Sequence, residues 1–156
     1  MMWQTIETEQ DVAELMWAAE HFHDWEVMSI DYEAHARAVV ENERHGDHYP
    51  WDTNAIIATF RYDTKDEDGN WPEIVLEFTG VSGTRFWVKD VDYLECCAIQ
   101  KGKRGWVFSI DERSMDEAGL DDPLSGDALS WICADKIRWK IQIALGEQAA
   151  RKGISE

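Results

Sequence analysis

The chain has few cysteines and no long apolar run. Three cysteines occur among 156 residues, Cys96, Cys97 and Cys133, and an odd number with one adjacent pair excludes a disulfide framework. Reduced thiols are the default in a reducing compartment. No stretch approaches the roughly 18 apolar residues that a membrane-spanning helix needs, and the N-terminus lacks the basic and apolar regions of a signal peptide. We therefore expect a cytoplasmic protein that does not enter a membrane.

Basic residues are scarce in the first two thirds of the chain. The sequence contains 32 Asp and Glu against 15 Lys and Arg, which gives a net charge of −17. The first 100 residues hold 22 acidic and 6 basic side chains, whereas the last 56 hold 10 and 9. Such a field repels nucleic acids and anionic membranes and attracts basic proteins. The alternative is that the charge serves only solubility.

Sequence motifs of the common catalytic and cofactor-binding sites are also lacking. The chain contains no phosphate-binding loop, dinucleotide-binding glycine pattern, nucleophile elbow or zinc-finger spacing. We therefore predict no cofactor and favour a binding protein over an enzyme. An active site assembled only in space stays open, because such sites leave no local motif.

The composition that is present, 44% hydrophobic with nine tryptophans, predicts one globular domain over residues 1–156. Thr8 is a suitable N-cap, and apolar residues recur after it at helical spacing. This pattern predicts an N-terminal helix that ends near residues 20–22. The residues of its apolar face are Val12, Leu15, Met16 and Ala19.

After this helix the apolar period changes to two, which is typical of half-buried strands. An Asp-Gly pair within residues 66–70 predicts a hairpin turn, and glycine-containing turns are predicted at residues 80–83 and 101–105. About eight strands with short turns predict an α+β fold that is mainly antiparallel β, a sandwich or an open barrel with the N-terminal helix packed on it. The alternating apolar sets are Met28, Ile30 and Tyr32; Ile56, Ala58, Phe60 and Tyr62; Ile74, Leu76 and Phe78; and Ile137, Trp139, Ile141 and Ile143.

The first candidate site is the junction between the helix and the first long strand. His21, His23 and Asp24 stand close together there, and these residue types can bind a metal or carry out acid–base chemistry. The alternative is structural: Asp24 would bond backbone groups at the corner, and His23 would fill space between helix and sheet.

Further candidates lie in a polar loop and among the tryptophans. His45 and His48 are weak additional metal ligands, and a solvated loop explains them equally well. Trp25, Trp51 and Trp71 are candidate anchors for a protein partner, because tryptophan is enriched at the centres of interfaces.

The final strand has a basic face formed by Lys136, Arg138 and Lys140, with Trp139 on the opposite face. Nucleic acid binding would need aromatic side chains among these charges, so we predict that the protein does not bind nucleic acid. Protection of an edge strand, or pairing with the acidic part of the chain, explains the basic face better.

Three segments carry a resemblance to a known set of proteins: the corner Phe22-His23-Asp24, the strand at residues 73–78 with Gly80 and Val81 after it, and residues 134–139. Over most of the chain these resemble a family of small bacterial proteins of uncharacterised function with an N-terminal helix and an F-H-D corner. Some bacterial proteins of this size and acidity are immunity proteins of toxin systems. That analogy implies a protein-binding role and assigns no residue roles.

Together these observations favour an acidic protein-binding domain, of the immunity type, that inhibits a basic toxin or enzyme. The alternatives are a small metal-dependent or acid–base enzyme at His21, His23 and Asp24, and a structural or regulatory domain without a small-molecule site.

Overall fold

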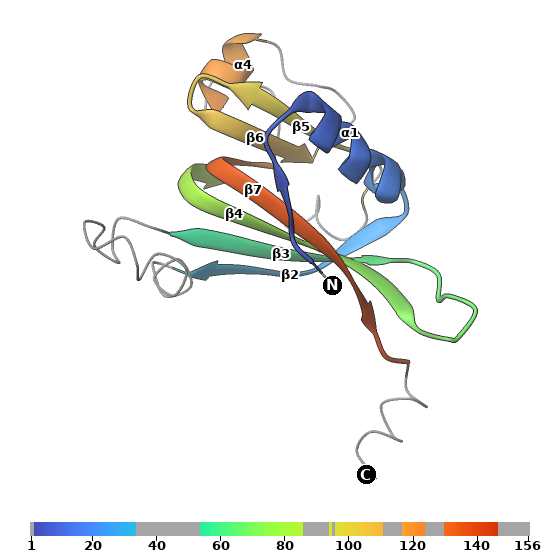
Figure 1. Ribbon diagram of the computed structural model, residues 1–156. Helices are drawn as coiled ribbons and strands as arrows, with labels where there is room; N and C mark the ends of the chain where they lie inside the picture. The colour runs from blue at the N-terminus through green and yellow to red at the C-terminus, as the bar shows by residue number, and fades with distance from the viewer. Residues whose placement is uncertain are drawn as a thin grey trace.

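The computed structural model describes residues 2–33, 54–85, 94, 96–110, 117–123 and 130–146. Figure 1 shows the arrangement of its helices and strands. In chain order they are β1 (Gln4–Ile6), α1 (Glu9–Ala18), the 3-10 turn η1 (Glu20–Phe22), β2 (Trp25–Glu33), β3 (Ala55–Tyr62), β4 (Trp71–Arg85), β5 (Cys97–Gly102), β6 (Gly105–Ile110), α4 (Glu117–Asp121) and β7 (Ser130–Ala144).

The seven described strands form one antiparallel sheet in the order β2-β3-β4-β7-β6-β5, and the short strand β1 pairs with β7. The predicted α+β class, mainly antiparallel with a helix near the N-terminus, is confirmed. Within the described residues the sheet does not close, because its two end strands, β2 and β5, do not pair with each other. A single isolated bridge, between Trp25 and Leu94, connects the start of β2 to the chain shortly before β5.

The sheet bends where β4 passes Gly80 and Gly83. We expected a turn here, and that expectation is wrong, because β4 continues through these residues to Arg85. Gly80 has φ +67°, and the pairing register with β7 shifts between Val81 and Gly83. Irregularities of this kind bend a strand and increase its twist. The bend brings β5 and β6 back over β3 and β4 (Figure 1).

Helix α1 begins as the sequence predicts. The Thr8 hydroxyl accepts a hydrogen bond from the Asp11 N–H at 3.2 Å, and the Asp11 carboxylate accepts one from the Thr8 N–H at 2.9 Å. A further bond from the Glu7 N–H to this carboxylate is the main cause of the lowered pKa of Asp11. Leu15 and Met16 are buried, as the predicted apolar face requires.

Strand β2 follows its predicted alternation only in part. Met28 and Tyr32, expected on the inner face, are 44% and 63% exposed. A register shift in the pairing with β3 between Val27 and Ser29 leaves Met28 out of the alternation. Tyr32 stays opposite the buried Ile56, one residue before the end of β2. Ile30 packs against the core as predicted, and Val27 joins it there.

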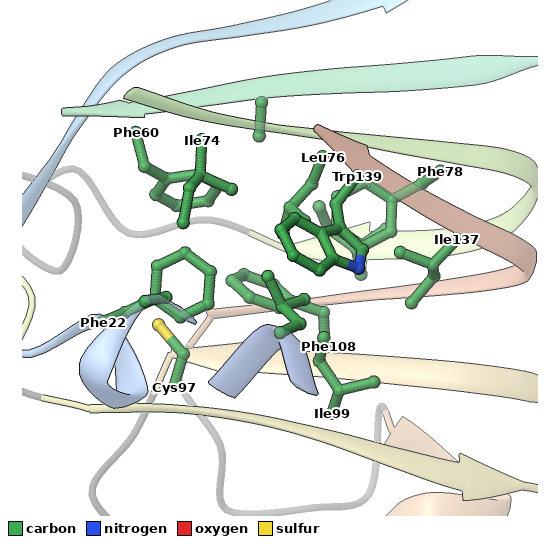
Figure 2. Packing of buried hydrophobic residues seen from close by; sticks show 14 of the residues in the cluster. Phe22, Phe60, Ile74, Leu76, Phe78, Cys97, Ile99, Phe108, Ile137 and Trp139 are labelled. Carbon is green, nitrogen blue, oxygen red and sulfur yellow. The ribbon is translucent and has the colours of Figure 1, made fainter. Parts of the chain in front are cut away.

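The bent sheet has two arms, one formed by β3, β4 and the second half of β7 and the other by β5 and β6, and the core lies between them (Figure 2). Phe22 from η1, Phe60 from β3 and Phe108 from β6 meet at its centre, with ring centroids 5.0–6.1 Å apart. Phe78 from β4 joins Phe108 at 5.5 Å. These contacts connect the helix corner to both arms of the sheet.

The outer face of β3, β4 and β7 carries paired charges. Arg61 Nη2 lies 2.9 Å from Glu73 Oε2, and Arg138 Nε lies 2.8 Å from Glu77 Oε1, with a second bond from Arg138 Nη2 to Glu77 Oε2 at 3.1 Å. Both carboxylates are buried. Each acidic side chain that β4 places on this face is therefore neutralised by an arginine of a neighbouring strand.

The basic face does not protect an edge strand, which was one of the two explanations offered from the sequence. Strand β7 lies inside the sheet and pairs with β4, β6 and β1. Its Arg138 pairs with the acidic part of the chain, which was the other expectation. The ring of Trp3 lies beside this basic face, with Arg138 Cζ at 4.4 Å and Lys140 Nζ at 4.7 Å from its centroid. An aromatic contact on this face was missed because Trp3 is far from β7 in the sequence.

Candidate functional site

The corner between α1 and β2 has an unusual backbone. Glu20, His21, Phe22 and Asp24 have φ values of 49°, 58°, 61° and 67°. Residues other than glycine rarely adopt this left-handed conformation, which costs about 1–2 kcal/mol per residue. Such conformations persist only where the surrounding structure enforces them, and they gather at functional sites.

Packing and backbone hydrogen bonds hold this corner in place. The Phe22 N–H donates to the Ala19 carbonyl at 2.8 Å, and the Asp24 N–H donates to the Leu94 carbonyl at 3.2 Å. Phe22 itself is fully buried and contacts the aromatic rings of Trp25, Phe60 and Phe108. Figure 2 shows its ring beside Phe108 and Cys97. The strained turn is thus anchored by one core side chain.

Of the predicted histidine site, the structure brings His23 and Asp24 together. His23 Nδ1 lies 3.0 Å from Asp24 Oδ2, and the His23 side chain is 65% exposed, so it does not fill space between helix and sheet. His21 is also exposed. Within the described ranges, no group of three or more His, Cys, Asp or Glu side chains could hold a metal ion. His45 and His48 lie outside the described residues.

The predicted tryptophan anchors do not form one surface. Trp25 is buried at the corner, whereas Trp71, on the outer face of β4, lies beside Arg61 Cζ at 5.5 Å and Lys65 Nζ at 5.3 Å from its ring centroid. Trp51 lies outside the described residues. Trp17 near the end of α1, which the sequence analysis did not single out, is 85% exposed. The available signal was its position off the apolar face of an amphipathic helix.

Next to the corner is a hollow of about 240 Å³. The end of α1, the start of β2 and one end of the β3, β4 and β7 strands surround it. Its walls are mostly apolar, with one carboxylate and one phenol among them. The lining residues are Ala18, Glu20, Trp25, Tyr62, Pro72, Ile74 and Ile141.

Strand pairing explains why these residues meet. Trp25 is opposite Tyr62 in the β2–β3 pair, with ring centroids 5.4 Å apart, and Ile74 is opposite Ile141 in the β4–β7 pair. Ile141 is 39% exposed because the inner face here extends beyond the packed core. The hollow therefore lies where the strand ends leave the core uncovered.

Three carboxylates act on the phenol of Tyr62 in the wall of the hollow. The pKa of Tyr62 is raised above its usual value near 10, first by the negative charge of Glu20, then by burial and by the charges of Asp63 and Asp24. The Asp63 N–H donates to the Asp24 carbonyl at 3.0 Å, which holds these two residues together. The last turn of α1 contains no basic residue, although the partial negative charge of a helix C-terminus favours one.

The Trp25 indole N–H is buried, and no group in the described part of the chain accepts a hydrogen bond from it. An unpaired buried donor costs about 1–3 kcal/mol. Trp131, in a second cluster with Val107 and Cys133, also has a buried indole N–H without a hydrogen-bond partner among the described residues. Unpaired indole donors are therefore not confined to the hollow.

The sequence predicted a site role for Trp25, which lines the hollow, but for none of the other lining residues. Glu20 and Tyr62 were interpreted only as a helix end and a strand residue. The predicted Asp-Gly hairpin contained a usable signal, because its turn brings Tyr62 and Pro72 to the same end of β3 and β4.

Comparison of the chain with family models, with curated proteins and with solved structures gives no match. No helix in the described part of the chain is long and apolar enough to cross a membrane.

Proposed function

We propose that this chain is an acidic protein-binding domain, of the immunity type, that inhibits a basic toxin or enzyme. The observation that carries the proposal is the apolar hollow at the end of α1, with Glu20 in its wall and the charges of Asp24 and Asp63 acting on it. Apolar surface gives an interface its affinity, and carboxylates around it select a basic partner and speed association.

The exposed tryptophan at the end of the helix supports the same surface. Trp17 precedes Ala18, which lines the hollow, and a tryptophan that is 85% exposed leaves a large apolar area in water. Tryptophan is among the residues that contribute most to binding when a partner covers them. We assign Trp17 as an anchor of this interface.

The net charge of −17 makes the association sensitive to salt. Oppositely charged partners associate faster at low ionic strength, because added salt screens the long-range attraction between them. The proposal also includes a cytoplasmic location, which three free cysteines suit.

The test starts with the full-length protein immobilised and exposed to a lysate of its native host, and then uses each retained protein in purified form. We expect a basic protein whose own activity falls when this chain is added, and whose association rate drops at least tenfold between 50 and 300 mM salt. Trp17→Ala should weaken binding roughly 30-fold, the effect of a central interface residue, without lowering stability. The proposal is wrong if no basic protein is retained, or if the retained protein keeps its activity.

The alternative of an acid–base enzyme at His21, His23 and Asp24 has the contact between His23 and Asp24 in its favour. Neither side chain lines the hollow, and His23 is largely exposed to solvent. A catalytic base needs a substrate held within hydrogen-bond distance, and the enclosed space at this corner lies elsewhere.

A further inference from the structure

We infer that the hollow receives the side chain of one arginine of the basic partner, a conclusion that rests on the proposed binding function. The hollow lies within the surface assigned above, between Ala18 at the end of α1 and Ile141 near the end of β7. The inference thus names the group on the partner that this site recognises.

The size of the hollow excludes most other occupants. Sites for small molecules usually enclose about 300–1,000 Å³, whereas this hollow has about 240 Å³. It is also open on one side to the acidic surface, so an occupant can enter while it stays attached to a larger molecule. One long side chain fits these limits better than a free ligand or a helix.

The chemistry of the walls suits a side chain with an apolar stem and a cationic end. Pro72, Ile74 and Ile141 give apolar contacts for the stem. Glu20 can accept hydrogen bonds from the cationic end, and the Tyr62 ring offers a face for a cation. A purely apolar side chain would leave Glu20 without a counter-charge, and an acidic one would be repelled.

Arginine fits these walls better than lysine. Its guanidinium is planar, stacks on aromatic rings, pairs with a carboxylate through two hydrogen bonds and sheds water more readily than an ammonium group. The outer face of this protein already uses that contact, since Arg61 lies against both the Trp71 ring and Glu73. The described residues that line the hollow repeat half of that arrangement, with an aromatic ring and a carboxylate but no guanidinium among them.

The first experiment uses short peptides in place of the partner. The full-length protein, labelled with ¹⁵N, is titrated with acetyl-Gly-Arg-Gly-amide and with the same peptide containing lysine or norleucine, at constant ionic strength. The Trp25 indole resonance, assigned with Trp25→Phe, should shift saturably with the arginine peptide, less with lysine and least with norleucine. Equal shifts for arginine and norleucine, no shift with any peptide, or tighter binding of lysine would overturn the inference.

Three variants locate the binding. Ala18→Phe fills the hollow and should abolish the arginine-dependent shift. Glu20→Gln should weaken binding roughly fivefold, the upper range for a partly exposed ion pair. The matched control, Glu14→Gln, removes the same charge from the nearby helix α1 without touching the hollow and should leave binding unchanged. Because Glu20 is exposed, Glu20→Gln tests the inference even if Ala18→Phe does not fold.

The same variants separate this inference from the proposed function. If a basic partner is found and binds wild type, Ala18→Phe and Glu20→Gln with equal affinity, the inference is wrong and the binding function stands. If no basic partner is found, the binding function fails, and the inference fails with it.

Discussion

The outer face of the sheet and the corner after α1 both gather acidic side chains, but they treat the charge in opposite ways. On the outer face, Glu73 and Glu77 are buried, and each meets an arginine within 3 Å. At the corner, the charges of Glu20, Asp24 and Asp63 act together on Tyr62 and raise its pKa. The negative charge of this protein is therefore neutralised where it supports the sheet and concentrated where the surface is hollow.

The two regions also differ in how they are held. Ion pairs and hydrogen bonds across strands organise the outer face, whereas the corner depends on the buried ring of Phe22 to keep a strained turn. Strain is tolerated when many contacts enforce it, and it accompanies functional sites more often than purely structural ones. The following changes test this contrast.

The largest effect is expected from Phe22→Ala. Removing a fully buried ring should lower the free energy of unfolding by about 4 kcal/mol, measured by chemical denaturation. The turn should also relax and carry Glu20 away from Tyr62, so the pKa of Tyr62 should fall. Phe78→Ala is the control, because it removes an equally buried ring and leaves the corner intact. An unchanged Tyr62 pKa in Phe22→Ala would show that Phe22 does not hold the corner.

On the outer face, Arg138→Met should lower the free energy of unfolding by about 3 kcal/mol, because it leaves the buried Glu77 carboxylate without this guanidinium. Denaturation curves measure the change. Combining Arg138→Met with Glu77→Leu should recover most of the loss, since an apolar pair of similar size replaces both charges. A single variant as stable as wild type would mean that the pair does not stabilise the face.

His21→Gly should make the protein more stable by about 1 kcal/mol. His21 is exposed with φ +58°, and glycine adopts this conformation without strain. His23→Gly is the matched control: His23 has φ −69°, so glycine relieves nothing there and should destabilise by about 0.5–1 kcal/mol. If both variants lose stability equally, the left-handed backbone stores no strain.

The smallest effect is expected from Glu20→Gln, which should lower the pKa of Tyr62 toward 10 with little change in stability. Removing a negative charge makes the phenolate less unfavourable. Above about pH 10 the unfolded chain loses the phenol proton while the folded protein keeps it, so the free energy of unfolding declines as the pH rises from there to the folded pKa of Tyr62. Glu20→Gln lowers the folded pKa and so shortens the pH range over which stability declines. An NMR titration of the Tyr62 ring measures the shift. Glu14→Gln should leave it unchanged.

The sequence predicted the elements that depend on neighbours along the chain. Thr8 caps α1 because its hydroxyl reaches a backbone N–H three residues away, and the turn over residues 66–70 forms because Gly69 adopts φ +78°. The inner face of β3, with Ile56, Ala58 and Phe60, followed from alternation alone. The sequence was less informative where one irregular residue changes the strand register, as in β2 and between Gly80 and Gly83 in β4.

The hollow could not be derived in this way, because its walls come from six elements that extend from Ala18 to Ile141 in the chain. Trp25 was recognised as a candidate anchor from its residue type, whereas Tyr62, Ile74 and Ile141 had the pattern of ordinary core strands. Whether an apolar side chain is covered depends on where the opposite layer ends, and no local pattern records this.

By itself, the sequence determined the fold class, the helix and its cap, and the excess of acidic residues in the first 100 positions. Only the tertiary structure decided which of those charges are neutralised. Arg138 reaches Glu77 across a strand pair that connects residues 61 positions apart, while the end of α1 brings Glu20 to Tyr62 with no arginine in its last turn. Charge is a property of composition, but its effect depends on distance, and folding sets the distances.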